Sequence, residues 1–288
     1  MSVLAGSWSW AWRLRRRLAN NVRPPRSWEQ SHAQWMAERV PGRSFADIGG
    51  LYGADGATAF AAEDLGASEV TCFDAGDPDL CGFAELHRTR GSRVRFVQGD
   101  LEDPESVSRI GMHDIVWCTG VIYHSPSPAR QLMYLREITR EWLYLSTMTI
   151  PELPGFPQAC IYYPGLDERA RKPFAAGYRW AGGGGTEMIG VGSPIDATPM
   201  RGHANCWWGI TRSALWAMLA TARFELVEER RIFPSPFFTE IVARPAPTAP
   251  MLPPLSYFRE RGDARERGDE RPPFEGYYER QGPRPPAR

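Results

Sequence analysis

The chain has 288 residues, of which 42% are hydrophobic and 24% charged, a composition typical of a globular protein. Its 34 basic and 34 acidic side chains cancel, so net charge provides no overall attraction to nucleic acid or to an anionic membrane. No apolar stretch approaches the roughly 20 residues of a membrane span. We therefore expect a cytoplasmic protein whose five widely spaced cysteines remain reduced.

Residues 1–43 form a preamble rich in tryptophan and arginine, with Trp8, Trp10 and Trp12 ahead of the basic run 13–17. The pattern predicts an N-terminal helix that covers a cleft of the following domain or a partner subunit in a homodimer. The alternative is a basic aromatic helix that contacts an anionic membrane or RNA phosphates.

The core, residues 44–244, alternates short β-rich runs with helical patterns, as parallel sheets with crossover helices do. Strands are expected at 44–48, 70–73, 94–97, 114–118, 142–148, 226–233 and 237–243. Helices are expected at 57–65, 80–90, 104–110, 129–139 and 212–222. Because Pro234-Ser235-Pro236 separates the last two strands, they should form an antiparallel hairpin. The prediction is an α/β fold, a doubly wound, seven-stranded, mostly parallel sheet.

A glycine-rich turn joins the first expected strand to the first helix, Asp47-Ile48-Gly49-Gly50-Leu51-Tyr52-Gly53. Glycines allow sharp bends and close approach to a ligand. Asp74 ends the second strand, where a carboxylate can accept ribose hydroxyls, and Asp100 ends the third. Carboxyl ends of parallel strands meet at one edge, which predicts a nucleoside site. The alternative is that these residues only form turns.

The glycine spacing distinguishes between nucleoside cofactors. Leu51 and Ala54 stand where a dinucleotide fingerprint needs glycine, and no Walker-type motif is present. The methyltransferase pattern D/E-x-G-x-G-x-G has Asp47, Gly49 and Gly53 in place, with Leu51 departing at the middle glycine. The expected cofactor is S-adenosyl-L-methionine, bound on a Rossmann-like methyltransferase fold.

Two further segments, 117–128 and 205–215, resemble the G-V-L-Y-H-x-x-x-P and N-x-x-x-x-P-S-x-x-x-L segments of the tRNA wobble-uridine carboxymethyltransferase family and its small-molecule methyltransferase relatives. The resemblance implies that Tyr123 contacts the cofactor. Ser125 and Pro126 replace the arginines that would hold a carboxylated cofactor, so ordinary S-adenosylmethionine is expected. The predicted cofactor-binding set is Asp47, Gly49, Gly50, Gly53, Asp74, Asp100, Leu101, Cys118 and Tyr123.

A methyl group on a sulfonium is already activated, so the protein mainly has to align the acceptor. His124, just after the fourth strand, is the first candidate for a catalytic base, and His203 is the second. The alternative for His124 is a loop histidine that caps a helix or packs. His32, His87 and His113 have no evident partners and read as surface or packing residues. No residues have metal-ligand spacing, so no metal is expected.

Residues 151–204 exceed an ordinary connection between a strand and a helix, which predicts an insertion or lid. Its aromatic residues precede a glycine run and suggest a cover over an apolar or planar acceptor: Phe156, Tyr162, Tyr163, Phe174, Tyr178, Trp180 and 182–185. The alternative is that the rings only pack the insertion onto the sheet edge. Residues 245–288, rich in proline and arginine, should be a disordered tail.

These features together predict a methyltransferase that acts on a small molecule with a hydroxyl or amine acceptor, such as a sugar or a secondary metabolite. One alternative is a tRNA-modifying methyltransferase. Another is a noncatalytic, cofactor-binding partner subunit.

Overall fold

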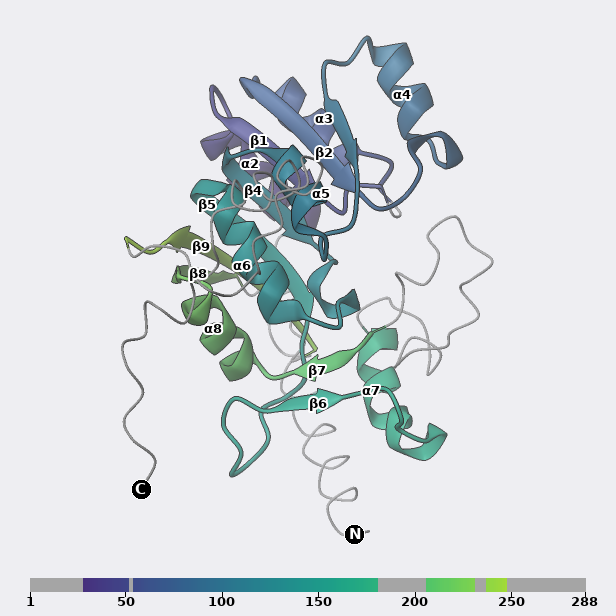
Figure 1. Cartoon of the computed structure of the whole chain (residues 1–288), viewed down its shortest axis with the longest axis vertical. Helices are drawn as coiled ribbons and strands as arrows, with labels where there is room; N and C mark the ends of the chain where they lie inside the picture. Colours follow the sequence, from purple (N-terminus) through teal and green to yellow (C-terminus); the bar gives the residue numbers. More distant parts are fainter. Residues whose placement is uncertain (1–27, 52–53, 181–205, 231–236, 248–288) are drawn as a thin grey trace, which may run out of the picture.

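A single seven-stranded sheet forms the centre of the molecule (Figure 1). The computed structural model describes residues 28–51, 54–180, 206–230 and 237–247. The strand order is β3-β2-β1-β4-β5-β9-β8. The strands are β1 Ser44–Ile48, β2 Glu69–Asp74, β3 Arg95–Gln98, β4 His113–Thr119, β5 Thr139–Met148, β8 Phe224–Arg230 and β9 Phe238–Pro245.

β1 to β5 run parallel, and β9 is antiparallel to both β5 and β8. The predicted α/β fold with a mostly parallel seven-stranded sheet and an antiparallel final hairpin is therefore confirmed. The strand order reverses between β1 and β4, which is the topological switch point of a doubly wound sheet.

The crossover helices occupy the expected places, with ends that shift by a few residues. They are α3 Ala57–Asp64, α4 Phe83–Arg90, α5 Pro104–Ile110, α6 Pro128–Ile138 and α8 Arg212–Thr221, with short 3-10 turns η1 Pro78–Leu80 and η2 Ile122–His124. Side-chain caps set two of these boundaries: Asp103 accepts from the backbone of Ser106, and Thr211 from that of Ala214. Within the described ranges, no helix combines the length and apolarity needed to cross a bilayer.

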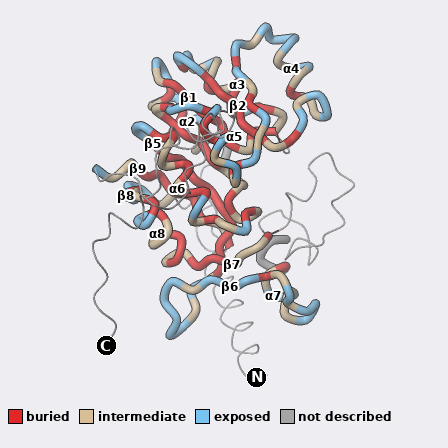
Figure 2. The backbone as a smooth tube through the Cα atoms, viewed as in Figure 1, coloured by how far each residue is buried: buried red, intermediate tan, exposed pale blue. Residues whose placement is uncertain are grey.

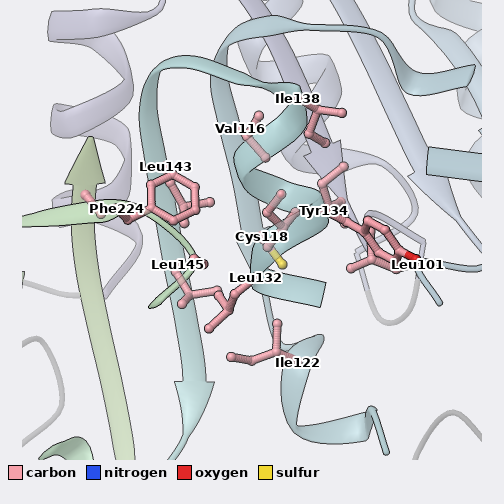
Figure 3. Close-up of a cluster of buried hydrophobic side chains, with 14 of the residues drawn as sticks. Leu101, Val116, Cys118, Ile122, Leu132, Tyr134, Ile138, Leu143, Leu145 and Phe224 are labelled. Atoms are coloured by element: carbon pink, nitrogen blue, oxygen red, sulfur yellow. The ribbon is translucent and has the colours of Figure 1, made fainter. Parts of the chain in front are cut away.

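Hydrophobic side chains cover both faces of the sheet because neighbouring strand residues point to opposite sides. On one face, Val116 and Cys118 of β4 pack with α5, α6 and α8 (Figure 3). On the other, Trp117 packs with α2, α3 and α4. Figure 2 shows the buried backbone concentrated along the central strands, with exposed backbone at α4 and near β6.

Helix α2, Trp28–Arg39, covers the second face and belongs to the folded unit although it precedes residue 44. The buried ring of Trp35 lies 5.0 Å from Tyr144 and 5.8 Å from Trp117, measured between ring centroids. The guanidinium of Arg39 lies over Trp35 and over Trp142, at 4.9 and 5.4 Å. Such cation–π contacts and aromatic burial attach α2 firmly to the sheet.

The buried carboxylate of Glu240 also holds α2 in place on the sheet. His32 Nε2 lies 3.2 Å from Glu240 Oε1, and Tyr144 Oη donates to Glu240 Oε2 at 3.0 Å. Glu240 is only 1% exposed, so the carboxylate needs these partners to offset its loss of water. The ring of His32 also stands edge-on to Trp117 and Tyr144. His32 is thus a packing residue with a specific carboxylate partner.

The insertion contains structure that local pattern did not predict. β6 Cys160–Tyr162 pairs antiparallel with β7 Trp208–Ile210, and α7 spans Glu168–Trp180. Figure 1 shows these elements together at the end of the molecule away from α4. Two strands of three residues, separated by more than forty positions, carry too little periodicity to be recognised in advance. Residues 181–205 lie outside the described part of the chain.

Replacing Trp35 by alanine tests the attachment of α2. We expect the free energy of unfolding to fall by about 3–5 kcal/mol, because a buried indole leaves a large cavity. Urea denaturation should show a lower midpoint with an unchanged slope. Met112→Ala, at a side chain that is 49% exposed, is the control and should change little. Equal midpoints for Trp35→Ala and wild type would contradict the packing role of α2.

Candidate cofactor and acceptor site

The candidate site lies at the carboxyl edge of the parallel strands, where the loops after β1, β2, β3 and β4 converge. Ile48 is level with Phe73 of β2 and with Cys118 of β4, so the loops that follow start at the same height. The glycine turn, Asp74 and the segment after Thr119 are therefore neighbours in space. Asp100 follows β3 at the same edge and is exposed.

Gly49 and Gly50 are required by the protein's own close packing. Gly49 has φ +78°, and a Cβ there would come within 2.4 Å of Val121 Cγ2. A Cβ on Gly50 would meet Asp47 Oδ2 at 2.6 Å and Cys72 Sγ at 2.7 Å. Any side chain would thus push the turn away from the loop after β4. Gly53, another predicted cofactor residue, lies outside the described residues.

Leu51 explains the departure from the glycine pattern. Its side chain is buried in the hydrophobic cluster beneath α2 and α3, and its N–H donates to Asp74 Oδ2 at 2.9 Å. The middle position of the turn therefore faces the core, where an apolar side chain contributes to stability.

Asp47 is a buried carboxyl group with an unusual environment. It is 3% exposed, and no described residue hydrogen-bonds to its Oδ2. Burial, followed by the nearby charge of Asp74, raises the pKa of Asp47 to about 7, while the N–H of Ala59 opposes the shift. Burial next to these carboxyl groups also raises the pKa of Cys72. A positive charge or a hydrogen-bond donor at this edge would stabilise the ionised pair.

Asp74 holds two loops together. Its Oδ2 accepts from Leu51, and its Oδ1 accepts from the N–H of Gly76 at 2.7 Å. This double backbone contact was not foreseen from the sequence. Each carboxylate oxygen still has a second lone pair, so the predicted contact with ribose hydroxyls stays compatible with the geometry and stays a prediction.

Leu101 and Cys118 have side chains inside the core rather than in the site (Figure 3). Both are buried, and burial raises the pKa of the Cys118 thiol. Their predicted role in cofactor binding therefore depends on their backbone atoms. Asp100, by contrast, is on the surface, where its Oδ1 accepts from the N–H of Glu102 at 2.8 Å.

The loop after β4 brings Tyr123 and His124 together in η2. Their ring centroids are 4.0 Å apart, and both side chains are half-buried. Gly120 has φ +76°, and its N–H donates to Ser146 O, which turns the chain back over β5. The phenol oxygen of Tyr123 would lie 3.7 Å from a Cβ on Gly120. His203, the second predicted base, lies outside the described residues.

The two-stranded sheet of β6 and β7 packs directly against this loop. The N–H of Trp207 donates to Tyr123 O at 3.1 Å, and Trp208 Nε1 donates to Pro126 O at 3.0 Å. Tyr162 lies 4.7 Å from Trp208 between ring centroids and is 48% exposed. The two-stranded sheet of β6 and β7 therefore lies beside the loop that carries His124.

Several residues with specific contacts were missed in the sequence. Ser125 donates to Glu102, which ties the loop after β4 to the turn after β3. Two histidines read as partnerless also have polar neighbours: His87 Nε2 lies 2.9 Å from Val94 O, and His113 Nε2 lies 3.1 Å from Thr71 Oγ1. Burial lowers the pKa of His113. The contacts of Ser125 and His113 join residues far apart in the sequence and have no local signature.

In the described portion of the chain, no three His, Cys, Asp or Glu side chains are grouped so that they could hold a metal ion.

No protein-family model matches the chain, and no curated protein matches it significantly in sequence. Solved structures with a similar backbone include the N-terminal domain of EvdMO1 in the presence of SAH and D-fucose, with 19% identity, 75% of this chain and 81% of that chain covered, and a TM-score of 0.48. The magnesium protoporphyrin IX methyltransferase ChlM from Synechocystis PCC 6803 with bound SAM has 14% identity, 75% and 77% coverage, and a TM-score of 0.45.

The [4+2]-cyclase SpnF is similar as well, with 15% identity, 78% and 85% coverage, and a TM-score of 0.47. At such identities and TM-scores, these similarities carry no conclusion about the activity of this chain.

Replacing Asp47 by asparagine tests its environment. The pKa of Asp47 is higher in the folded protein than in the unfolded chain. Between about pH 4 and 7 the folded wild type therefore holds one more proton than the unfolded chain, and its free energy of unfolding falls as the pH rises through that window. Asparagine has no such cost. The free energy of unfolding of Asp47→Asn, relative to wild type, should rise by roughly 2–3 kcal/mol from pH 5 to pH 8. The slope is about 1.4 kcal/mol per pH unit up to about pH 7, where the change levels off.

Urea denaturation at both pH values measures this difference. Asp79→Asn, at an exposed carboxylate, is the matched control and should follow wild type. A parallel pH profile for Asp47→Asn would show that the carboxyl group ionises freely in the folded protein.

Proposed function

We propose that this chain is an enzyme that binds S-adenosyl-L-methionine and directs methyl transfer to a small-molecule acceptor. The observation that carries the proposal is the convergence of three features at one sheet edge. These are the glycine turn locked against Val121, the carboxyl pair Asp47 and Asp74, and the loop that presents Tyr123 and His124. The coarser part of this proposal, a cofactor-binding α/β fold, agrees with the strand order.

The residues present fit this cofactor. The cofactor would supply a methyl group already activated by a sulfonium. Asp47 has a buried oxygen that no described residue satisfies, which favours a donor or a positive charge at this edge. Asp74 retains lone pairs that can accept hydrogen bonds from hydroxyl groups. Asp100, exposed after the third strand, can accept a hydrogen bond from the amino group of an adenine. Tyr123 closes the side of the site next to β4.

His124 would hold the proton that a hydroxyl acceptor loses. The acceptor oxygen gains nucleophilicity as the imidazole takes its proton, and the ring of Tyr123, 4.0 Å away, restricts the orientation of His124. For an amine acceptor that is already neutral, alignment alone supplies most of the acceleration.

The aromatic side chains of β6 and at the start of β7 support a small acceptor with a flat or apolar face. Trp207 and Trp208 are pinned by hydrogen bonds to the same loop that carries His124, and Tyr162 leaves half of its surface uncovered next to them. A sugar ring or a planar metabolite can stack on such side chains.

Calorimetry with S-adenosylmethionine and S-adenosylhomocysteine tests the cofactor. Asp74→Ala should weaken binding by about tenfold or more, because hydrogen bonds to a charged acceptor contribute roughly 1.5–3 kcal/mol each. Asp79→Ala, at an exposed carboxylate nearby in the sequence, is the matched control. The melting temperature reports how far Asp74→Ala also loosens the Leu51 and Gly76 contacts. Absence of binding by wild type would overturn the proposed function.

His124→Ala tests the base. With a hydroxyl acceptor, kcat should fall by roughly 10²–10⁴-fold while the affinity for S-adenosylhomocysteine stays constant. The wild-type rate should rise with pH as the imidazole of a general base deprotonates, and the mutant should lack that limb. His87→Ala is the control on α4. Unchanged turnover would limit His124 to shaping its loop, whereas lost cofactor binding would place it in the nucleoside pocket.

The acceptor class is tested by incubating the enzyme with labelled cofactor and either a metabolite extract or purified tRNA. Label transfer to small molecules supports the proposal, and transfer to tRNA alone would overturn the substrate class while retaining the reaction.

A further inference from the structure

A single carboxylate links the turn after β3 to the loop after β4. Ser125 is buried, and its hydroxyl donates to Glu102 Oε1. The same hydroxyl oxygen accepts the N–H of Ser127 at 2.8 Å, and that N–H also favours the ionised form of Glu102. Glu102 therefore contacts the loop through the Ser125 side chain, which in turn holds the backbone of Ser127.

The two ends of this contact adjoin the residues of the proposed site. Glu102 is two residues after Asp100, and its own N–H is held by Asp100 Oδ1. Ser125 directly follows His124 and ends η2. The neighbouring hydrophobic residues, Leu101 and Ile122, are both buried in the core (Figure 3). The core thus anchors the base of each loop, while the Glu102–Ser125 contact orients the parts above it.

The surroundings of Glu102 act in both directions on its ionisation, and the net effect is a raised pKa. Burial raises the pKa of Glu102, and Asp100 raises it further. The hydrogen bond from Ser125 and the charge of Arg130 act in the opposite direction. A half-buried carboxylate that accepts from a buried hydroxyl is more strongly held than a surface carboxylate.

We infer that Glu102 is a positioning residue that holds the His124 loop against the Asp100 turn. The contact fixes the position of His124, on the methyl-transfer side of the proposed site, relative to Asp100, on its adenine side. This inference rests on the proposed function for its catalytic consequence, but the contact itself can be tested without any ligand. Glu102 need not touch the cofactor or the acceptor to act in this way.

Hydrogen–deuterium exchange of the ligand-free protein tests the contact first. Glu102→Ala should speed exchange of the peptide amides at 121–127 by roughly tenfold, the effect of losing one charge-assisted hydrogen bond. Glu102→Gln retains an oxygen that can accept from Ser125 and should restore most of the protection. Glu105→Ala removes an exposed carboxylate from the first turn of α5, close by in the sequence, and should exchange like wild type.

A double-mutant cycle with Ser125→Ala separates this contact from general loosening. If Glu102 acts through Ser125, the double variant should exchange no faster than Glu102→Ala alone. Additive effects would overturn the proposal, as would wild-type exchange in Glu102→Ala. A melting temperature close to wild type should accompany the change, since the core beneath both loops is intact.

The catalytic consequence is tested on the variants that retain their fold. Glu102→Ala should lower kcat at least tenfold and weaken S-adenosylhomocysteine binding by a smaller factor, and Glu102→Gln should recover both. Wild-type kcat in Glu102→Ala together with faster exchange would overturn the positioning role. If wild type binds no S-adenosylhomocysteine, the proposed function fails, while the exchange cycle still decides whether Glu102 orders the loop.

Discussion

The carboxylate of Asp74 is the interaction on which the candidate site depends. It ends β2 and accepts the backbone N–H groups of Leu51 and Gly76, which belong to two different loops. These contacts bring the glycine turn down onto the sheet edge, and the turn then leaves no space for a side chain against Val121. The position of the loop after β4 is in turn limited by this close packing of Gly49 against Val121. One carboxylate therefore determines the relative height of three loops.

Much of the fold was predictable because it depends on local periodicity. The buried strand at Ser44–Ile48, the helix after Ala57 and the capped helix at Pro104–Ile110 each carry their own signal in neighbouring residues. The final hairpin was recognised from its two prolines. The convergence of Asp47, Asp74 and His124 at one edge follows from the rule that parallel strands end together.

The rest depends on contacts between residues far apart in the chain. Nothing near Glu240 indicates that it will meet His32 and Tyr144, because the contact requires α2 to lie on the sheet. Leu51 departs from the glycine motif, and only the folded structure explains why, because its side chain faces the core. The Glu102–Ser125 contact likewise joins two turns that the sequence presents separately.

The antiparallel pairing of Tyr162 with Trp208 has a consequence for how this protein can change. The chain leaves the domain after β6 and returns at β7, at the same place, so β6 and β7 act as a stem. Loop-closure entropy grows slowly with length, and doubling a loop costs only about 0.6 kcal/mol. Changes of length in this segment that keep the packing of Phe174 and Ala175 against Tyr163 and Met148 should therefore cost little, and the sheet should keep its register. Such a stem is a natural junction for grafting segments from other proteins onto this sheet.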